Sequence, residues 1–146
     1  VQSLHKTAGS LTQTALLHLP DGSSLQTSTV QQALNTLQTT SPSYLLMASL
    51  DLASAWLGSD EGMEAIDAAV LGVLALRQRI TYDLPSFALL PLDAVDPLRL
   101  YLRHAERAGE DWAGELEERL GVSYETATPW GALYITQPFH TPKELN

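Results

Sequence analysis

The chain opens with the stretch Val1-Gln2-Ser3-Leu4-His5-Lys6-Thr7-Ala8-Gly9-Ser10-Leu11-Thr12-Gln13-Thr14-Ala15. In it a lysine follows a histidine and a serine, and small hydroxyl residues and a glycine come after it. A lysine among small, mostly neutral neighbours is partly desolvated, which disfavours its ammonium form. A neutral amine can attack a carbonyl, as Schiff-base lysines do, and nearby hydroxyl and backbone N–H groups can hold a phosphate. The plain alternative is a surface lysine in a polar loop.

Most of this stretch fits one cofactor-attachment pattern, in which a small residue and Ser-x-His-Lys are followed by small residues and by a Gln flanked by Ser, Thr or Ala. The matching residues are Val1, Ser3, His5, Lys6, Gly9, Ser10, Thr12, Gln13, Thr14 and Ala15. The stretch therefore resembles the pyridoxal-phosphate site of the ornithine/lysine/arginine decarboxylases. Residues 39–44 and parts of 96–136 resemble later segments of the same family, so the resemblance covers most of the chain.

The resemblance implies an α/β fold, namely part of an aspartate-aminotransferase-like (fold type I) large domain followed by much of the small C-terminal α/β domain. Residues 1–80 would belong to the large domain, 81–97 to the connection and 98–146 to the small domain. The implied activity is pyridoxal-phosphate-dependent decarboxylation of arginine, lysine or ornithine to the amine, as in polyamine biosynthesis. Arginine is favoured, because the chain resembles compact members of the family.

By resemblance, Lys6 carries the cofactor covalently, and His5 and Ser3 lie beside it, with Ser3 on the phosphate. Thr39 and Ser41 are implied to contact the phosphate across the interface of a homodimer. The family's residues ahead of the lysine are absent from this sequence: the acidic partner of the ring nitrogen, the ring-stacking histidine and the first phosphate loop. We therefore expect this chain to begin inside a longer one and to be inactive alone. The alternative is a non-catalytic α/β domain with a role in assembly.

Composition narrows the other function classes. The net charge of -9 argues against a nucleic-acid partner, which would require a basic face. The chain has no cysteine, which excludes disulfides, thiolate catalysis and cysteine-based zinc sites. The four histidines lie far apart without a metal-ligand spacing, so no metal is expected. The longest apolar stretch, residues 68–76, is too short to span a bilayer, so we expect a cytoplasmic enzyme without a membrane partner.

The first half of the chain alternates turn signals with apolar patterns. Residues 14–19 predict a short buried strand that ends at Pro20-Asp21-Gly22, with Lys6 in the loop that enters it. His18 lies within this apolar run, where a packed or hydrogen-bonded histidine is favoured over a ligand. The spacing of Val30, Ala33, Leu34 and Leu37 predicts an amphipathic helix with Ser28 as its N-cap.

Two further helices are predicted after it. Ser41 would cap a helix with Pro42 at its first position and a buried stripe of Leu45, Ser49, Leu52 and Trp56. Thr39 and Ser41 can therefore be read as phosphate contacts at a helix N-terminus or as simple capping groups. Ser59 or Asp60 begins a long helix that runs to about Ile80 and is apolar on most sides, Leu71 included. Arg77 and Arg79 suit its C-terminal end; the alternative is that one binds a carboxylate.

The remaining residues predict a smaller mixed region. Prolines punctuate residues 82–97, which indicates an extended connection. A strand is expected at 98–102, a helix from Glu110 to Gly121, and two strands at 122–126 and 133–136. The charged run around Glu115 is typical of a solvated helix face. Residues 141–145 resemble the start of another helix.

Overall fold

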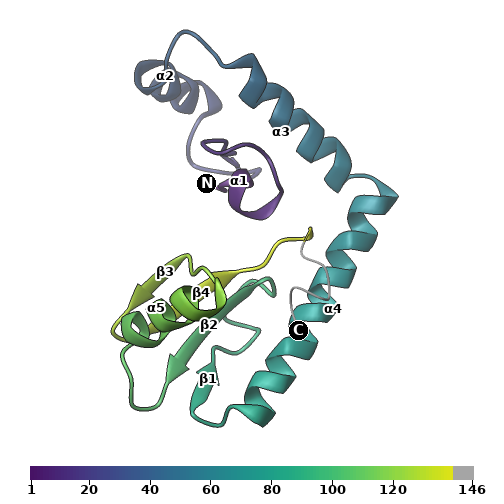
Figure 1. The fold of residues 1–146 in the computed structure, drawn as a ribbon. Coiled ribbons are helices and arrows are strands. Elements are labelled where there is room, and N and C mark those ends of the chain that lie inside the picture. Colours follow the sequence, from purple (N-terminus) through teal and green to yellow (C-terminus); the bar gives the residue numbers. More distant parts are fainter. Residues whose placement is uncertain (140–146) are drawn as a thin grey trace. The chain divides into compact units, whose positions relative to one another are not determined.

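The computed structural model describes residues 1–139 of the chain, which form helices and strands as the α/β prediction requires. They divide into two compact units, the first Val1–Gly58 and the second beginning at Ser59 (Figure 1). The first unit holds the helices α1 (Leu4–Thr7), α2 (Thr27–Leu37) and α3 (Tyr44–Leu57). The second holds α4 (Asp60–Asp83), β1 (Phe87–Leu89), β2 (Arg99–His104), α5 (Gly109–Leu120), β3 (Thr126–Thr128) and β4 (Gly131–Ile135). The expected division into large and small domains concerns the whole enzyme and stays a prediction.

The core of the first unit forms where α1 meets α3. Leu4 and Ala8 are one helical turn apart and pack with the buried Ala53, and Leu50 and Leu57 line the same contact. These three positions of α3 follow the 3.6-residue helical period, so they share one face. α1 therefore rests on the C-terminal half of α3.

The predicted strand at 14–19 is wrong. The chain makes one isolated antiparallel bridge there, between Gln2 and Leu16, with both N–H···O distances 2.8 Å. Leu16 and Leu17 are exposed. A strand needs a neighbour along its whole length to satisfy its backbone groups, and no described segment continues the pairing. His18 is exposed, and its Nε2 lies 3.0 Å from Gln2 Oε1, so it is hydrogen-bonded rather than packed.

Two of the predicted N-caps are each displaced by two residues. α2 begins at Thr27 after Gln26 rather than Ser28, and α3 begins at Tyr44, where Ser43 accepts a hydrogen bond from Leu46 N at 3.4 Å. Ser41 and Pro42 both precede the helix, so neither the predicted cap nor the predicted first position is correct. The cap of α4 is confirmed, because Ser59 accepts from Gly62 N at 3.1 Å.

The predicted buried faces of the two long helices are wrong in part. On α3, Leu45 and Leu52 are each 70% exposed, whereas Ala53 is buried and Ser49 and Trp56 are half-buried. On α4 only one stripe is buried: Gly62, Ala69, Val73, Arg77 and Ile80. Leu71 lies off that stripe and is 66% exposed. The period of apolar residues identifies each helix, but the face that is buried depends on which elements of the same unit pack against it.

The second unit is built on a four-stranded antiparallel sheet in the order β1-β2-β4-β3. Residues 87–89 form β1 although prolines led us to expect an extended connection there. Trp112 of α5 is 2% exposed and lies edge-on to Phe87 at 5.1 Å and stacked on Tyr134 at 6.2 Å. Val73, Leu100, Ala113 and Ala132 complete this core.

α5 approaches the β3–β4 hairpin closely, and glycine allows it. A Cβ added at Gly109 would collide with the backbone of Gly131, and one added at Gly131 would collide with Leu102 O. Gly121 ends α5 in the left-handed conformation, φ 69°, as the sequence predicts. The helix start expected at 141–145 lies outside the described residues.

Candidate functional site

α1 presents the two chemically active side chains of the first unit. Leu4 and Ala8 face α3, which leaves the half-buried His5 and Lys6 on the other sides of the same turn. The turn is helical, with Ala8 N donating to Leu4 O at 2.8 Å. Lys6 therefore lies on a short helix rather than in the predicted loop. Because the helix is anchored by its buried face, the backbone that carries the Lys6 amine is fixed.

His5 is held by the segment that follows α1. Its Nδ1 donates to the carbonyl oxygen of Thr14 at 2.8 Å across nine residues. A carbonyl can only accept, so Nδ1 carries a proton and the other ring nitrogen, Nε2, is left for a further partner. Neighbouring helical residues do not face one another. The side chains of His5 and Lys6 therefore leave the turn in different directions.

Buried hydroxyls brace the turn between Ser10 and Thr14. Ser10 and Thr14 are 7% and 2% exposed, and their oxygens lie 2.5 Å apart. Thr14 Oγ1 also donates to Leu11 O at 2.7 Å, and Leu11 N donates to Ser49 Oγ of α3 at 2.6 Å. Gln13 takes a left-handed conformation with φ 79°, which a non-glycine residue rarely adopts. The cofactor-attachment motif does not predict that Ser10 and Thr14 brace the turn. The only sign of this role in the sequence is a pair of hydroxyl residues at the two ends of the turn.

Ser3 lies at the N-cap position of α1, half-buried, and its side chain makes no capping hydrogen bond. Its carbonyl accepts from Lys6 N at 3.1 Å. Its hydroxyl therefore lies at the N-terminus of the turn that carries Lys6 and does not cap the helix. The predicted residues Ser3, His5 and Lys6 share a single short element.

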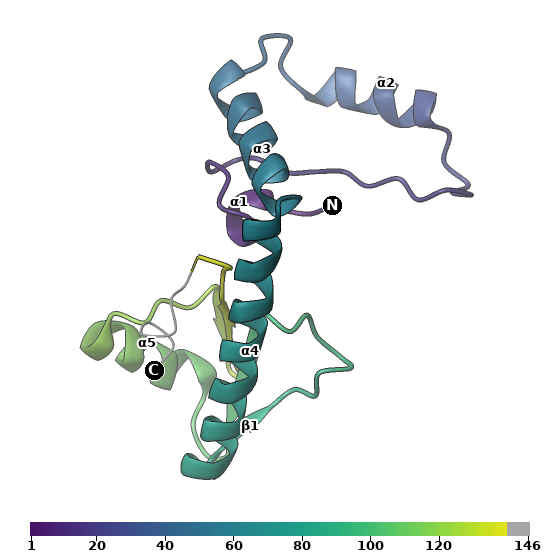
Figure 2. The same cartoon turned by 90° about the vertical axis from the view of Figure 1, so that its right-hand side faces the viewer.

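Thr39 and Ser41 lie apart from α1 within the first unit. Both are exposed, and Thr39 Oγ1 accepts from Ser41 N at 3.2 Å. They belong to the segment that joins α2 to the N-terminus of α3, whereas α1 rests on the other half of α3 (Figure 1, Figure 2). Neither caps α3, because Ser43 does. The chain by itself does not bring them together with Lys6.

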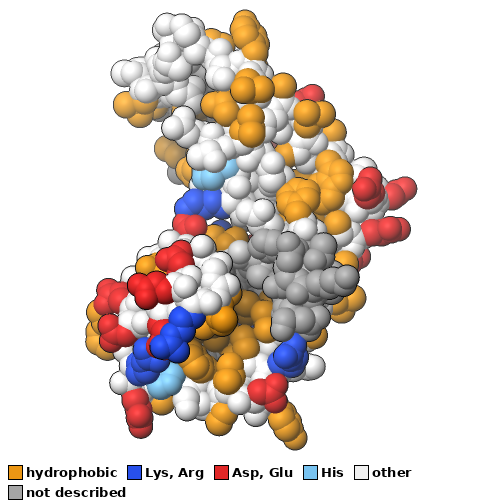
Figure 3. Space-filling view, in the orientation of Figure 1, with side chains coloured by type: hydrophobic (Ala, Val, Ile, Leu, Met, Phe, Trp, Pro, Cys, Tyr) orange, Lys and Arg blue, Asp and Glu red, His pale blue; other side chains and the backbone are white. Residues whose placement is uncertain are grey.

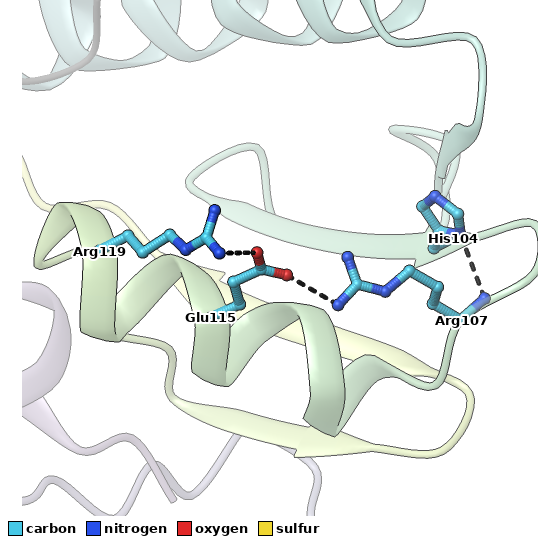
Figure 4. Close-up of polar contacts among 4 residues, drawn as sticks. All are labelled: His104, Arg107, Glu115 and Arg119. Atoms are coloured by element: carbon cyan, nitrogen blue, oxygen red, sulfur yellow. Dashed lines mark hydrogen bonds and ion pairs between the residues drawn. The ribbon is translucent and has the colours of Figure 1, made fainter.

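The second unit has a groove of about 330 Å³ lined by Phe87, Arg107, Trp112, Glu115, Leu116, Arg119 and Leu120. Glu115 lies between Arg107 and Arg119 at 2.8 and 3.1 Å (Figure 4). The hydrogen bond from Arg107, aided by both positive charges, holds the pKa of Glu115 below its usual value. His104 Nδ1 accepts from the backbone N–H groups of Glu106 and Arg107, each at 3.1 Å. Two arginines therefore share one carboxylate in this groove.

Neither a metal site nor a membrane span is found in the part of the chain that the structure describes. No three metal-ligating side chains gather there, and none of its helices is long and apolar enough to cross a bilayer. Lys6 shares its turn with His5 and follows Ser3 at the N-cap, and its amine is a group to which a carbonyl-bearing cofactor could attach.

Comparisons with known proteins agree on one family. The family profile described as "Orn/Lys/Arg decarboxylase, major domain" matches residues 1–119. The arginine decarboxylase of Halalkalibacterium halodurans is 45% identical over 168 aligned positions, which cover 99% of this chain and 31% of that protein. The uncharacterised protein YaaO of Bacillus subtilis is 35% identical over 108 residues, covering 70% of this chain and 22% of its own length. An arginine decarboxylase of the same organism is 47% identical over 58 residues, covering 40% and 12%.

Solved structures show a similar fold. The constitutive lysine decarboxylase of E. coli matches 99% of this chain and 26% of its own with a TM-score of 0.73 and 21% identity. The lysine decarboxylase of Francisella novicida matches 84% of this chain and 23% of its own with a TM-score of 0.64 and 16% identity. At these identities the likeness concerns the fold alone. The chain spans less than a third of each of these relatives.

Proposed function

Because the chain belongs to the Orn/Lys/Arg decarboxylase family, we propose that it is part of a larger enzyme that converts a basic amino acid to its amine with pyridoxal phosphate attached to Lys6. The observation that carries the proposal is the placement of His5 and Lys6 on α1 and of Ser3 at its N-cap position, in a turn whose buried face packs on α3. Catalytic groups depend on such a rigid support for their orientation.

The residues present fit attachment of this cofactor. Lys6 is half-buried, so its stem is held while its amine can reach a ligand. It is the sole Lys or Arg of residues 1–58. The hydroxyl of Ser3 lies on the same turn and could bind phosphate oxygens. When bound, the cofactor supplies an electron sink for the pair left by the departing carboxylate.

The roles of the neighbouring side chains follow from their surroundings. His5 offers Nε2 as a hydrogen-bond acceptor when the ring is neutral, since Nδ1 is bound to Thr14 O. Ser3 would orient the phosphate end and so fix the cofactor relative to the amine. The amine of Lys6, when it is not attached to the cofactor, could transfer a proton at the reacting carbon.

A homodimer is part of the same proposal. Thr39 and Ser41 lie at the opposite end of α3 from α1, which supports a role toward the site of a second chain rather than toward their own Lys6. Their exposed hydroxyls and backbone N–H groups would bind phosphate oxygens of the partner's cofactor. The site would then be complete only in the dimer.

We propose arginine as the substrate and the cytoplasm as the location. Two of the relatives described above carry the name arginine decarboxylase and are 45% and 47% identical to this chain, against 21% and 16% for the lysine decarboxylases. The first unit has only two carboxylates, Asp21 and Asp51, and both are exposed. Recognition of the substrate's cationic end would therefore need groups from the rest of the enzyme.

The test uses the complete enzyme with Lys6→Ala. We expect decarboxylation to fall by several orders of magnitude, while the circular-dichroism spectrum stays unchanged. Arginine, lysine and ornithine are compared as substrates by release of carbon dioxide, and arginine should have the highest kcat/KM. A variant that retains near-normal turnover would contradict the assignment and favour the alternative, a non-catalytic α/β domain that serves assembly.

A further inference from the structure

Thr14 is more completely bound than any other polar residue around Lys6. It is 2% exposed, and its N–H and its Oγ1 both donate to Leu11 O, at 3.3 and 2.7 Å. Its Oγ1 also lies 2.5 Å from Ser10 Oγ, and its carbonyl accepts from His5 Nδ1 at 2.8 Å. One buried residue therefore joins the turn at 10–14 to the ring beside the lysine.

The direction of each hydrogen bond of Thr14 follows from the number of protons that each group can donate. A hydroxyl has one proton to donate, and that of Thr14 goes to Leu11 O, so Ser10 donates to Thr14. The Thr14 carbonyl has none, so His5 must donate from Nδ1. In the neutral ring Nε2 then carries a lone pair, and it alone can accept from a ligand.

We infer that Thr14 is a positioning residue that holds His5 in its Nδ1–H tautomer, with Ser10 as its support; this inference deepens the proposed function and rests on it. The need for a brace is visible in the backbone. Gln13, directly before Thr14, is in the left-handed region at φ 79°, which is unfavourable without surrounding support. The two hydroxyl bonds and the Leu11–Ser49 bond supply that support, so the Thr14 carbonyl stays aimed at His5.

The functional consequence is a fixed acceptor, Nε2, on the residue directly before Lys6. A donor on the substrate or cofactor, an N–H or O–H group, would meet Nε2 rather than a ring that exchanges between tautomers. Removal of a partner that orients a metal-bound imidazole typically lowers metal affinity or activity by about 10–100-fold. We expect a loss in that range when the brace is removed.

The first test observes the tautomer in the chain itself, without cofactor. Histidine ring nitrogens are labelled with ¹⁵N, and the His5 signals are assigned by their loss in His5→Gln. The wild type and Thr14→Ser, which keeps the hydroxyl, should show a neutral His5 ring with its proton on Nδ1. Thr14→Val, of nearly equal shape, should show a mixture of the two tautomers. Thr12→Val, an exposed site in the same turn, is the matched control and should resemble the wild type.

Two results would overturn the inference: a wild-type His5 that is protonated on Nε2, or a folded Thr14→Val with unchanged His5 signals. The amide spectrum shows whether each variant is folded. If Thr14→Val is unfolded, Ser10→Ala decides, because it removes the donor to Thr14 and leaves the Thr14 hydroxyl in place. It should move the tautomer mixture in the same direction by a smaller amount, and an unchanged mixture would contradict the inference.

The second test separates this inference from the proposed function. In the complete enzyme, Thr14→Val should lower kcat about tenfold or more and change its pH profile, while KM changes little and borohydride still fixes the cofactor to Lys6. Thr14→Ser should restore kcat. If Lys6→Ala remains active, the proposed function fails, while the tautomer measurement on the cofactor-free chain still decides whether Thr14 orients His5.

Discussion

Tyr134 carries a buried hydroxyl for which the described residues provide no hydrogen-bond partner. Burial, with smaller contributions from Tyr124 and Glu117, raises its pKa from 10.0 to about 12. Because the folded-state pKa is above the unfolded value, the stability that this group contributes is complete below pH 10. It is lost as the pH rises toward about 12, at up to about 1.4 kcal/mol for each pH unit.

Tyr134→Phe should remove this pH dependence. At neutral pH the variant should be as stable as the wild type or more stable, because the substitution removes an unsatisfied buried polar atom and keeps the ring. Urea denaturation at pH 7 and at several values above pH 10 measures both effects. The account of this site is wrong if Phe at 134 destabilises the chain clearly at pH 7, or if both proteins lose stability equally in alkali.

At the scale of residues, the lysine motif could be predicted from the sequence, but the residues that hold its side chains in place, Ser10 and Thr14, could not. The Ser-x-His-Lys spacing is local, so it identifies Lys6, His5 and Ser3 directly. The bond from His5 to Thr14 depends on the left-handed backbone at Gln13, and nothing in the residue types indicates that Gln would adopt it. Thr39 and Ser41 were predicted as site residues, and their role stays a prediction.

Among the elements, α4 offers a matched pair of positions. Val73 is completely buried against Trp112 and Tyr134, whereas Leu71 is 66% exposed. Val73→Asp places an unpaired charge in the core and should destabilise the chain by several kcal/mol, about 3 or more. Leu71→Asp should change the free energy of unfolding by less than about 1 kcal/mol.

Thermal denaturation of the two variants measures the difference. The sequence alone predicts a severe effect of Leu71→Asp, because the helix is apolar on most sides. The exposure of Leu71 reverses that expectation for this chain. If both aspartates lower the melting temperature equally, the assigned buried face of α4 is wrong.

The long helices were predictable because their signals are local: Ser59 caps α4, Gly58 follows α3, and Gly121 ends α5. The short or paired elements were not. β1 has three residues and exists because β2 pairs with it. Conversely, residues 14–19 have the composition of a strand, but only Leu16 finds a partner. Pairing depends on distant segments, so a local pattern cannot decide it.

At the scale of the whole molecule, the main feature is the apolar surface that α3 exposes. On α3, Tyr44, Leu45, Met47 and Leu52 are between 52% and 79% exposed. Apolar side chains gather along this helix in the space-filling view (Figure 3). Large exposed apolar patches typically mark sites of association. This supports burial of α3 in the complete enzyme, by its remaining domains or by a second chain.

The shared-site proposal predicts complementation between inactive subunits. We expect Lys6→Ala subunits and subunits with Thr39→Ala and Ser41→Ala to regain part of the activity when they are mixed. A hybrid dimer would hold one site in which Lys6 and the partner's hydroxyls are both intact. Homogeneous samples of each variant serve as controls. Lack of any regained activity after verified subunit exchange, or an active monomer in sedimentation, would contradict the shared site.

The first fifteen residues predict the family, and the match over residues 1–119 confirms it. The central chemical claim of the proposed function is that the cofactor is attached to Lys6. The most direct measurement treats the complete enzyme with pyridoxal phosphate and borohydride, then locates the label by peptide mass spectrometry. We expect one modified peptide, carrying the reduced cofactor on Lys6, and its loss in Lys6→Ala. A label on Lys143 or on a lysine elsewhere in the enzyme, with Lys6 unmodified, would contradict the account.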